Sequence, residues 1–352
     1  MRIAIATDAW RPQINGVVRT LEMTVKLLRE RGHEVCVISP DQFRTVPCPG
    51  YGEIRLALAP RFGLRKKLAE FAPDIVHIST EGPIGWSTRR WCMVNSIPFT
   101  TAFHTRFPDY ASVRTGLSPD FFWPVMRIFH KSSRAVLSAT PRLSEELASR
   151  GISHTRPWTR GIDTGIFKPG LAPHPALANL PRPILLSVGR VAIEKNLESF
   201  LDADVPGTKV VVGDGPALEE LKARYPDAIF TGSLSGAELA QAYCAADVFV
   251  FPSKTDTFGL VMIEALACGV PVAGYPVPGP LDIIGGQGRG PYDDLSKPVG
   301  YVSESLPIAI KNALLCDRRD AAAYGALFTW DNALDQFLAA LHSARHHMLE
   351  TA

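Results

Sequence analysis

Two cations stand just after an apolar run in the stretch SVGRVAIEKN at 187–196, which contains Arg190 and Lys195. The run ends in Gly189 and a helix is expected to begin at Lys195, so backbone N–H groups at the helix start should point toward the same place as the cations. An arginine fork and a lysine point charge beside helix-terminal amides suit a diphosphate group. The alternative is that both side chains are solvated surface residues, as most arginines and lysines are.

A pair of carboxylates follows in DVFVFPSKTDTFGLVMIEALACGVPV at 247–272, where Asp256 precedes Glu264 by eight positions. Asp256 falls in a loop at the carboxyl end of an expected strand, and Glu264 falls about one turn inside the next helix. Two carboxylates so placed suit hydroxyl groups, such as those of a sugar and a ribose. If Glu264 is instead a structural helix residue, its carboxylate lies in an apolar segment and needs a partner.

The elements that must position these residues are short apolar runs that alternate with helical stretches, the pattern of a parallel, doubly wound sheet. The runs that predict strands are IAIAT (3–7), EVCVIS (34–39), DIVHIS (74–79), IPFTTAF (97–103), RAVLSAT (134–140), ILLSVG (184–189), KVVVGDG (209–215), AIFTG (228–232), DVFVFPS (247–253) and VPVAGY (270–275). Ligands of such sheets bind at the carboxyl ends of the strands, so the chemically informative residues are expected in loops.

The periodicity stops between Asp163 and Pro183, where the chain is rich in proline. At about 150 residues per domain, 352 residues make roughly two domains. We therefore expect an N-terminal α/β domain at 1–165 and a second α/β domain at 166–325, facing each other across a cleft. The final stretch, 326–352, is expected to be a helix that packs back on the first domain.

Composition predicts a soluble globular protein, with 46% hydrophobic and 20% charged residues. No apolar run approaches the ~20 residues of a membrane span, and the start, MRIAIATD, is unlike a signal peptide. The six cysteines form no CxxC pair, which favours reduced, mostly buried thiols over disulfides or zinc. We expect a cytoplasmic protein.

The charge is distributed unevenly, although the net charge of the chain is only +2. Residues 1–165 hold 23 lysines and arginines against 14 acidic residues, a net +9, whereas 166–352 hold 14 against 21, a net −7. A basic half can serve a nucleic acid, an anionic membrane or a phosphate-bearing ligand. No RNA- or DNA-binding motif occurs in the basic half, so we expect no nucleic-acid partner.

Several motifs together resemble glycosyltransferase family 4, whose members are retaining, nucleotide-sugar-dependent enzymes of the GT-B fold. They are Asn15-Gly16 in the first loop, FHTRFPDY at 103–110, GRVAIEKN at 189–196, GDGP at 213–216 and PSKTDTFGLVMIEALACGVPV at 252–272. The resemblance extends over nearly the whole chain. It implies two Rossmann-like domains that face a cleft.

The resemblance assigns the donor side of the site. Arg190 and Lys195 match the pair that holds the donor diphosphate, and Glu264 matches the carboxylate on the nucleotide ribose. Asp256 matches a glutamate that contacts the donor hexose, and it is one methylene shorter than that glutamate. The remaining donor-side matches are Gly16, which lets the first loop approach a donor phosphate, and the turn Phe258, Gly259 and Leu260, whose amides face the donor.

On the other side of the site, His104 matches a histidine that contacts the transferred sugar; taken alone, a single histidine is more often structural. The resemblance thus implies that His104, Arg190, Lys195 and Asp256 act in catalysis. The acceptor-side candidates are Glu81, Arg106, Asp109 and Tyr110. The implied reaction retains configuration, the donor phosphate itself takes the acceptor proton, and neither a metal nor a cofactor is needed beside the nucleotide sugar as co-substrate. Residues 202–204 match the DxD motif of metal-dependent glycosyltransferases, but they lack the preceding strand that a metal site of this type requires. We interpret this match as coincidental.

The acceptor is expected to be a membrane lipid such as diacylglycerol, and the donor is UDP- or GDP-linked. The alternatives are a GDP-mannose-dependent mannosyltransferase with a soluble or polysaccharide acceptor, and a nucleotide-sugar-binding protein without turnover. A related epimerase would lack the DTFG-x4-E arrangement, and a phosphorylase would be far longer.

Peripheral attachment to the inner face of an anionic membrane is expected from two basic, amphipathic stretches. The membrane-contact candidates are Arg61, Arg65, Lys66 and Lys67 in PRFGLRKKLAEF, Arg127 within FFWPVMRIF, and Lys131 two residues after that stretch. The alternative is that the aromatic residues Phe121, Trp123 and Phe129 belong to the core.

Overall fold

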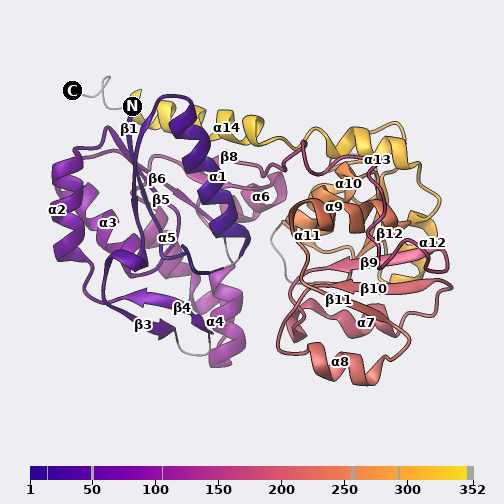
Figure 1. The fold of residues 1–352 in the computed structure, drawn as a ribbon. Coiled ribbons are helices and arrows are strands. Elements are labelled where there is room, and N and C mark those ends of the chain that lie inside the picture. The colour runs from indigo at the N-terminus through magenta and orange to yellow at the C-terminus, as the bar shows by residue number, and fades with distance from the viewer. Residues whose placement is uncertain (14, 49–50, 105, 255–257, 292–293, 347–352) are drawn as a thin grey trace. The chain divides into compact units, whose positions relative to one another are not determined.

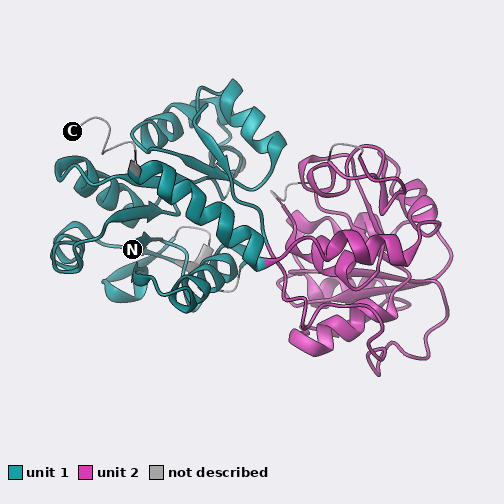
Figure 2. Ribbon diagram, turned by 90° about the horizontal axis from the view of Figure 1, so that it is seen from above, with its two compact units in different colours: residues 1–160, 330–352 teal, residues 161–329 magenta. Residues whose placement is uncertain are grey.

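The computed structural model describes the chain except for residues 14, 49–50, 105, 255–257, 292–293 and 347–352. The chain forms two compact units (Figure 1): unit 1 contains residues 1–160 and 330–352, and unit 2 contains residues 161–329. The chain thus passes into unit 2 after Arg160, five residues before the boundary expected from the sequence, and returns at Trp330. Figure 2 shows the C-terminal segment as part of unit 1.

Unit 1 is built on a six-stranded parallel sheet with the strand order β2-β1-β5-β6-β7-β8. The strands are β1 (Arg2–Ala6), β2 (Glu34–Ile38), β5 (Ile75–Ile78), β6 (Phe99–Ala102), β7 (Val136–Ser138) and β8 (Thr155–Pro157). The short strands β5 and β6 are buried along their whole length, because helices cover both faces of a parallel sheet. A separate antiparallel pair, β3 (Thr45–Cys48) and β4 (Tyr51–Ala57), was not expected from the sequence.

Two groups of helices cover the two faces of this sheet. The helices of unit 1 are α1 (Gly16–Glu30), α2 (Arg61–Phe71), α3 (Pro83–Val94), α4 (Phe107–Thr115), α5 (Trp123–His130), α6 (Pro141–Ser149) and α14 (Trp330–His346). Apolar residues of α1 and α14 pack with Ile3 and Ile5 on one face, and residues of α2, α3 and α5 pack with Ala4 and Ala6 on the other. Arg31 also pairs with Asp331 and Asp335 of α14.

Unit 2 has a second six-stranded parallel sheet, in the order β11-β10-β9-β12-β13-β14. Its strands are β9 (Ile184–Val188), β10 (Thr208–Val212), β11 (Ile229–Gly232), β12 (Val248–Phe251), β13 (Val272–Gly274) and β14 (Gly300–Val302). Its helices are α7 (Leu197–Leu201), α8 (Leu218–Arg224), α9 (Gly236–Ala245), α10 (Leu260–Ala267), α11 (Pro278–Ile283), α12 (Leu306–Ala313) and α13 (Arg318–Gly325). In Figure 1, α7 and α8 lie on one side of this sheet and α9 and α10 on the other.

The two strand orders locate a switch point in each unit, where the connections leave the sheet in opposite directions. In unit 1 it lies between β1 and β5, and in unit 2 between β9 and β12. The loops that follow these strands contain Asp8 and Glu81 in unit 1 and Arg190 and Lys195 in unit 2. The predicted doubly wound α/β fold is confirmed, and it places the chemically informative residues at the carboxyl edges of both sheets.

The thiols differ from expectation in their burial. None of the six cysteines, all of which lie in the described residues, forms a disulfide; Cys92 and Cys268 are buried and the other four are half-buried. The prediction of mostly buried thiols was therefore wrong.

Candidate functional site

The loop after β9 holds the two predicted diphosphate cations, and neighbouring loops fix its course. Gly189 N donates to Val212 O at 3.0 Å, and Val191 N donates to Asp214 O at 2.9 Å. At Gly213, which has φ +146°, a Cβ would lie 1.8 Å from Gly189 O, so only glycine fits there. The GDGP segment thus supports the backbone that presents Arg190.

Within that loop, Arg190 is exposed and Lys195 is half-buried. Lys195 ends a 3-10 turn, Ile193–Lys195, and Asn196 then adopts a left-handed conformation before the five-residue helix α7. The cation therefore stands on a turn before the helix and not within its first turn. Asn196 Nδ2 also donates to Pro252 O at 3.1 Å, which joins the loops that follow β9 and β12.

The loop after β12 leads into α10. Asp256 lies outside the described residues. Phe258 is buried and contacts the ring of Phe328, with 6.5 Å between centroids. Gly259 precedes the first residue of α10, Leu260, so the amino end of this helix lies at the carboxyl edge of the sheet, where its dipole favours an anion.

Glu264 lies in the second turn of α10 and is only 1% exposed. Its Oε2 accepts a hydrogen bond of 3.1 Å from the hydroxyl of Tyr243 on α9. The Tyr243 ring is fully buried and packs edge-on against Phe167 and Phe249. The sequence indicated that this carboxylate needs a partner, but not that Tyr243 supplies a donor.

The first loop of unit 1 is held by two polar side chains. Asn15 caps α1, because its Oδ1 accepts from Val17 N and Val18 N at 3.0 Å each. Gly16, the first residue of that helix, is exposed. Gln13 Nε2 donates to Asp8 O at 3.3 Å, so the loop between β1 and α1 is bonded back to its own beginning.

Asp8 joins that loop to the loop after β5, a role that the sequence did not reveal. Its carboxylate accepts from Ile84 N at 3.0 Å, Gly85 N at 3.3 Å and Thr80 Oγ1 at 2.9 Å, which caps the amino end of α3. A Cβ at Gly82 would lie 2.4 Å from Asp8 Cγ, so the two loops touch here. Burial raises the pKa of Asp8 to about 6, although these donors favour its charged form.

His104 lies two residues after the end of β6 and is 8% exposed. Its Nδ1 is 2.9 Å from Nη2 of Arg160, and its ring meets the Trp158 ring edge-on at 5.2 Å. Burial first, and then the charge of Arg160, lower the pKa of His104 well below its ordinary value. The sequence pointed to His104 but gave no sign of Arg160, which is 56 positions away.

Three acceptor-side candidates lie against polar or charged side chains of unit 1. The Oε1 of Glu81 lies 3.5 Å from Nε2 of the buried His130. Arg106 lies 3.4 Å from Asp109 and forms a second, two-pronged ion pair with Glu146 on α6. The side chain of Tyr110 lies outside the described residues. Arg106 and Asp109 are thus a paired group and not separate charges.

The membrane-contact candidates are exposed on two helices. Arg61, Arg65, Lys66 and Lys67 lie on α2, and Arg127 and Lys131 lie on or directly after α5. The core reading is correct for Trp123 and Phe129, at 4% and 0% exposed, but not for Phe121, at 71%. Val125 and Ile128 of α5 are exposed as well, at 45% and 55%.

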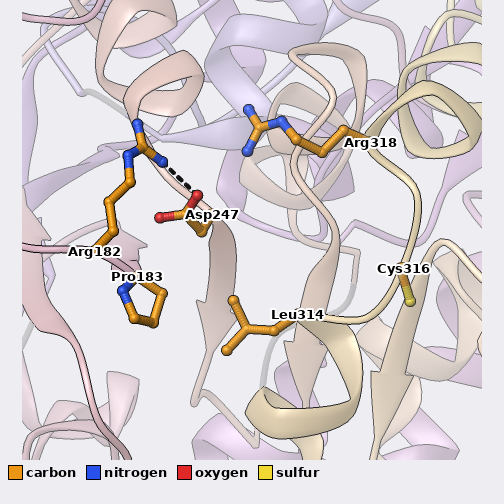
Figure 3. Close-up of a pocket in the computed structure, with 6 residues that line it drawn as sticks. All are labelled: Arg182, Pro183, Asp247, Leu314, Cys316 and Arg318. Carbon is orange, nitrogen blue, oxygen red and sulfur yellow. Dashed lines mark hydrogen bonds and ion pairs between the residues drawn. The ribbon is translucent and has the colours of Figure 1, made fainter.

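Unit 2 also has a pocket of about 340 Å³ that contains none of the predicted site residues (Figure 3). Its lining residues are Arg182, Pro183, Asp247, Leu314, Cys316 and Arg318. Pro183 and Asp247 directly precede β9 and β12, so the pocket lies at the opposite edge of the sheet from Arg190. Arg182 pairs with Asp247, and Arg318 donates to carbonyls at the end of α9, so both guanidinium groups are used within the fold.

Solved structures with a similar arrangement of elements define the fold. The chain aligns with sucrose-phosphate synthase of Thermosynechococcus elongatus at a TM-score of 0.71, with 23% identity and 99% coverage of each chain. It aligns with the catalytic domain of starch synthase IV of Arabidopsis thaliana at a TM-score of 0.68, with 14% identity, over 98% of this chain and 99% of that one. The fold is the GT-B fold, with two Rossmann-like units.

Sequence comparison then gives the family. Residues 14–165 match the model for Glycosyltransferase Family 4, and residues 182–315 match the model for glycosyl transferases group 1. A GDP-mannose-dependent alpha-mannosyltransferase of Mycobacterium tuberculosis is 30% identical over 347 residues, 92% of this chain and 90% of that protein. The chain therefore belongs to glycosyltransferase family 4, and it is a glycosyltransferase.

Two further relatives carry different names. A sulfoquinovosyl transferase of Arabidopsis thaliana is 31% identical over 300 residues, which are 77% of this chain and 58% of the plant protein. An alpha-monoglucosyldiacylglycerol synthase of Streptococcus pneumoniae is 27% identical over 320 residues, 79% of this chain and 72% of that protein.

Proposed function

We propose that the protein transfers a hexose from a nucleotide sugar to a hydroxyl of a membrane lipid, such as diacylglycerol, with retention of configuration. The observation that carries the proposal is the switch point of unit 2. There Arg190 and Lys195 follow β9, the amino end of α10 follows β12, and Asn196 bonds the two loops together. Such a cluster of positive groups at a sheet edge suits a nucleoside diphosphate.

In this mechanism the protein's main contribution is electrostatic. Arg190 and Lys195 bind the diphosphate and stabilise the charge that develops on it as the sugar leaves. Glu264 binds the ribose, Asp256 contacts the hexose, and His104 contacts the transferred sugar. The acceptor enters on the face from which the diphosphate leaves, so the configuration is retained. The donor phosphate takes the acceptor proton, and the two cations occupy the place of a metal.

Labelled nucleotide sugars test this function. UDP-glucose, UDP-galactose, UDP-glucuronate and GDP-mannose, each labelled in the sugar, are incubated with the protein and a total lipid extract. We expect label in the lipid phase from one donor. Vesicles that contain diacylglycerol should also accept the label when they are used instead of the extract. Nucleotide binding without turnover on any acceptor would instead indicate a binding protein.

A second candidate, a GDP-mannose donor with a soluble or polysaccharide acceptor, is favoured by the names of three relatives. Proteins named GDP-mannose-dependent alpha-mannosyltransferase, from three bacteria, are 30–32% identical over 81–97% of this chain. The same assay separates the two candidates when a water-soluble polysaccharide fraction is run in parallel with the lipid extract, because label from GDP-mannose in that fraction and not in the lipid would support the second and contradict the first.

The exposed surfaces of α2 and α5 support a lipid acceptor. Four basic residues on α2 at about 1 kcal/mol each near an anionic surface contribute roughly 4 kcal/mol, which suits reversible attachment that salt weakens. Beside the basic residues of α5, the exposed Phe121, Val125 and Ile128 offer apolar groups to an interface. Within the described residues, no helix is long and apolar enough to cross a membrane.

Vesicle sedimentation tests the attachment. The protein should sediment with anionic vesicles at low salt, remain in solution with zwitterionic vesicles, and be released by high salt. Charge reversal at Lys66 and Lys67 should weaken the binding, whereas reversal at Lys222, an exposed lysine of unit 2, serves as the matched control. If the wild-type protein does not sediment with anionic vesicles, the soluble acceptor becomes the better proposal.

A further inference from the structure

Arg160, the last residue of unit 1 before the chain enters unit 2, is held rigidly beside His104. Its Nη1 donates to the carbonyls of Trp158 and Thr159, at 2.7 Å and 3.2 Å, and its Nη2 lies 2.9 Å from His104 Nδ1. The guanidinium carbon is 5.0 Å from the centroid of the Trp158 ring. Backbone, ring and imidazole thus fix the position of the guanidinium group on three sides.

This guanidinium group is a buried cation that has no carboxylate partner within the described part of the chain. Arg160 is 8% exposed, and among the described residues none of the acidic side chains lies within ion-pair distance of it. Burial lowers its pKa only to about 10, so it remains charged at neutral pH. A buried cation is unfavourable unless it is hydrogen-bonded, and here the two carbonyls, the Trp158 ring and His104 Nδ1 compensate for the lost water.

The bond to Arg160 determines which nitrogen of His104 carries the proton. A guanidinium group has N–H donors and no acceptor, so Nδ1 of His104 must accept. The single proton of a neutral imidazole then lies on Nε2. An imidazolium ring would place a second cation against Arg160, and the neighbouring His77 of β5 acts in the same direction as Arg160 on the pKa of His104.

We propose that Arg160 is a positioning residue that holds His104 as the neutral tautomer with its proton on Nε2, so that His104 donates a hydrogen bond to the transferred sugar and acts as neither acid nor base. The contact with the sugar rests on the proposed function, whereas the tautomer follows from the contacts within unit 1. In the transfer reaction, His104 therefore gains and loses no proton.

Nitrogen NMR of the full-length protein labelled with ¹⁵N-histidine tests the tautomer directly. The signals of His104, assigned by their loss in His104→Asn, should show a protonated Nε2 and an unprotonated Nδ1. They should stay unchanged from about pH 8 down to about pH 5.5. A proton on Nδ1, or an imidazolium ring within that range, overturns the proposal.

Three variants separate positioning from a merely structural role. Arg160→Leu removes the donor to Nδ1, so the proton of His104 should distribute between Nδ1 and Nε2 and both nitrogen signals should shift toward averaged positions. Transfer should fall in proportion to the fraction of molecules that lose the proton from Nε2. Arg160→Gln keeps an amide donor and should keep the tautomer. Arg156→Leu, which removes an exposed arginine bonded to a backbone carbonyl, is the matched control and should change neither readout.

The possible results have distinct meanings. Unchanged His104 signals in a folded Arg160→Leu protein would contradict the role of Arg160. If that variant does not fold, the wild-type spectrum together with Arg160→Gln decides the question. If the tautomer is as expected but no nucleotide sugar is turned over, the proposed function fails and the assignment of Arg160 and His104 stands.

Discussion

The two units present their candidate residues at equivalent edges of similar sheets but place the charges in different surroundings. In unit 2, Arg190 is exposed and Lys195 is half-buried on a loop. In unit 1, Asp8 and His104 are buried, and burial shifts the pKa of each toward its neutral form. The cations of unit 2 can therefore meet a charged ligand directly, whereas burial shifts the protonation equilibria of the groups in unit 1.

Glu264 is the exception within unit 2. It is as buried as the groups of unit 1, and Tyr243 donates to its carboxylate. Changes at Arg190 or Lys195 should thus alter ligand binding with little effect on stability, while changes at Asp8 should alter stability and its pH dependence. A change at Tyr243 should alter both stability and ligand binding, each to a smaller extent.

The largest effect is expected from Arg190 and Lys195, the two cations on the loop after β9. Arg190→Ala and Lys195→Ala each remove a charge-assisted hydrogen bond of about 1.5–3 kcal/mol, so each should lower kcat/KM by roughly 10- to 150-fold. The melting temperature should stay close to that of the wild type, because neither side chain is part of a core. Lys311→Ala, at an exposed position on α12, is the control. Normal rates in both variants would remove the donor-site assignment.

The next effect should appear in stability as a function of pH. Because the pKa of Asp8 in the folded protein is about 6, above its ordinary 3.8, the folded state binds the proton more tightly. The stabilisation is complete below about pH 4 and is lost as the pH rises through 6, by about 3 kcal/mol in total.

Urea unfolding of the wild type and Asp8→Asn at several pH values measures this loss. The difference in unfolding free energy between the two proteins should change by up to this amount between pH 4 and pH 7, with the wild type losing stability as the pH rises. Asp41→Asn, at an exposed position of unit 1, should show no such trend. A difference that is flat across the range would mean that Asp8 is not desolvated as described.

The strands and the donor cations were accessible from the sequence for local reasons. Fully buried parallel strands are continuous apolar runs, and the ten predicted runs correspond to β1, β2, β5, β6, β7 and β9–β13. The edge strands β8 and β14 were missed, because segments such as Thr155–Pro157 contain no continuous apolar run.

The partners of the site residues were not accessible in this way. Tyr243 is 21 positions from Glu264, Arg160 is 56 from His104, and Ile84 is 76 from Asp8. These hydrogen bonds form only when separate strands and helices of one unit come together, so the local spacing of residues in the sequence does not predict them. Phe121 shows the converse, because the alternative reading placed this aromatic residue in the core with Trp123 and Phe129, and it is exposed.

A smaller effect is expected at Tyr243. Tyr243→Phe removes one donor to a buried carboxylate, and a hydrogen bond to a charged group contributes about 1.5–3 kcal/mol. Part of this loss should appear as weaker nucleoside diphosphate binding, about five- to tenfold, because Glu264 loses its fixed orientation. Titration calorimetry of Tyr243→Phe beside Glu264→Gln measures it, and Glu264→Gln should weaken binding more. If Glu264→Gln binds the nucleotide with wild-type affinity, the ribose role of Glu264 is wrong.

The smallest effect is expected from removing divalent cations. This experiment tests whether the two cations of unit 2 can balance the charge of the diphosphate without a metal ion. Arg190 and Lys195 bring two positive charges to the edge of the sheet where the donor diphosphate is proposed to bind, and the amino end of α10 adds a partial positive charge of about one half. Together these groups can balance the charge that develops on the leaving diphosphate. The transfer rate measured in EDTA should therefore stay within about twofold of the untreated rate, since a twofold change corresponds to about 0.4 kcal/mol.

The matched control is the same rate measurement on Lys195→Ala, where added magnesium should restore part of the lost rate by replacing the missing cation. Complete loss of wild-type activity in EDTA that magnesium reverses would show that the two side chains do not balance the diphosphate alone, and the contrast between the units would then rest on burial and not on charge.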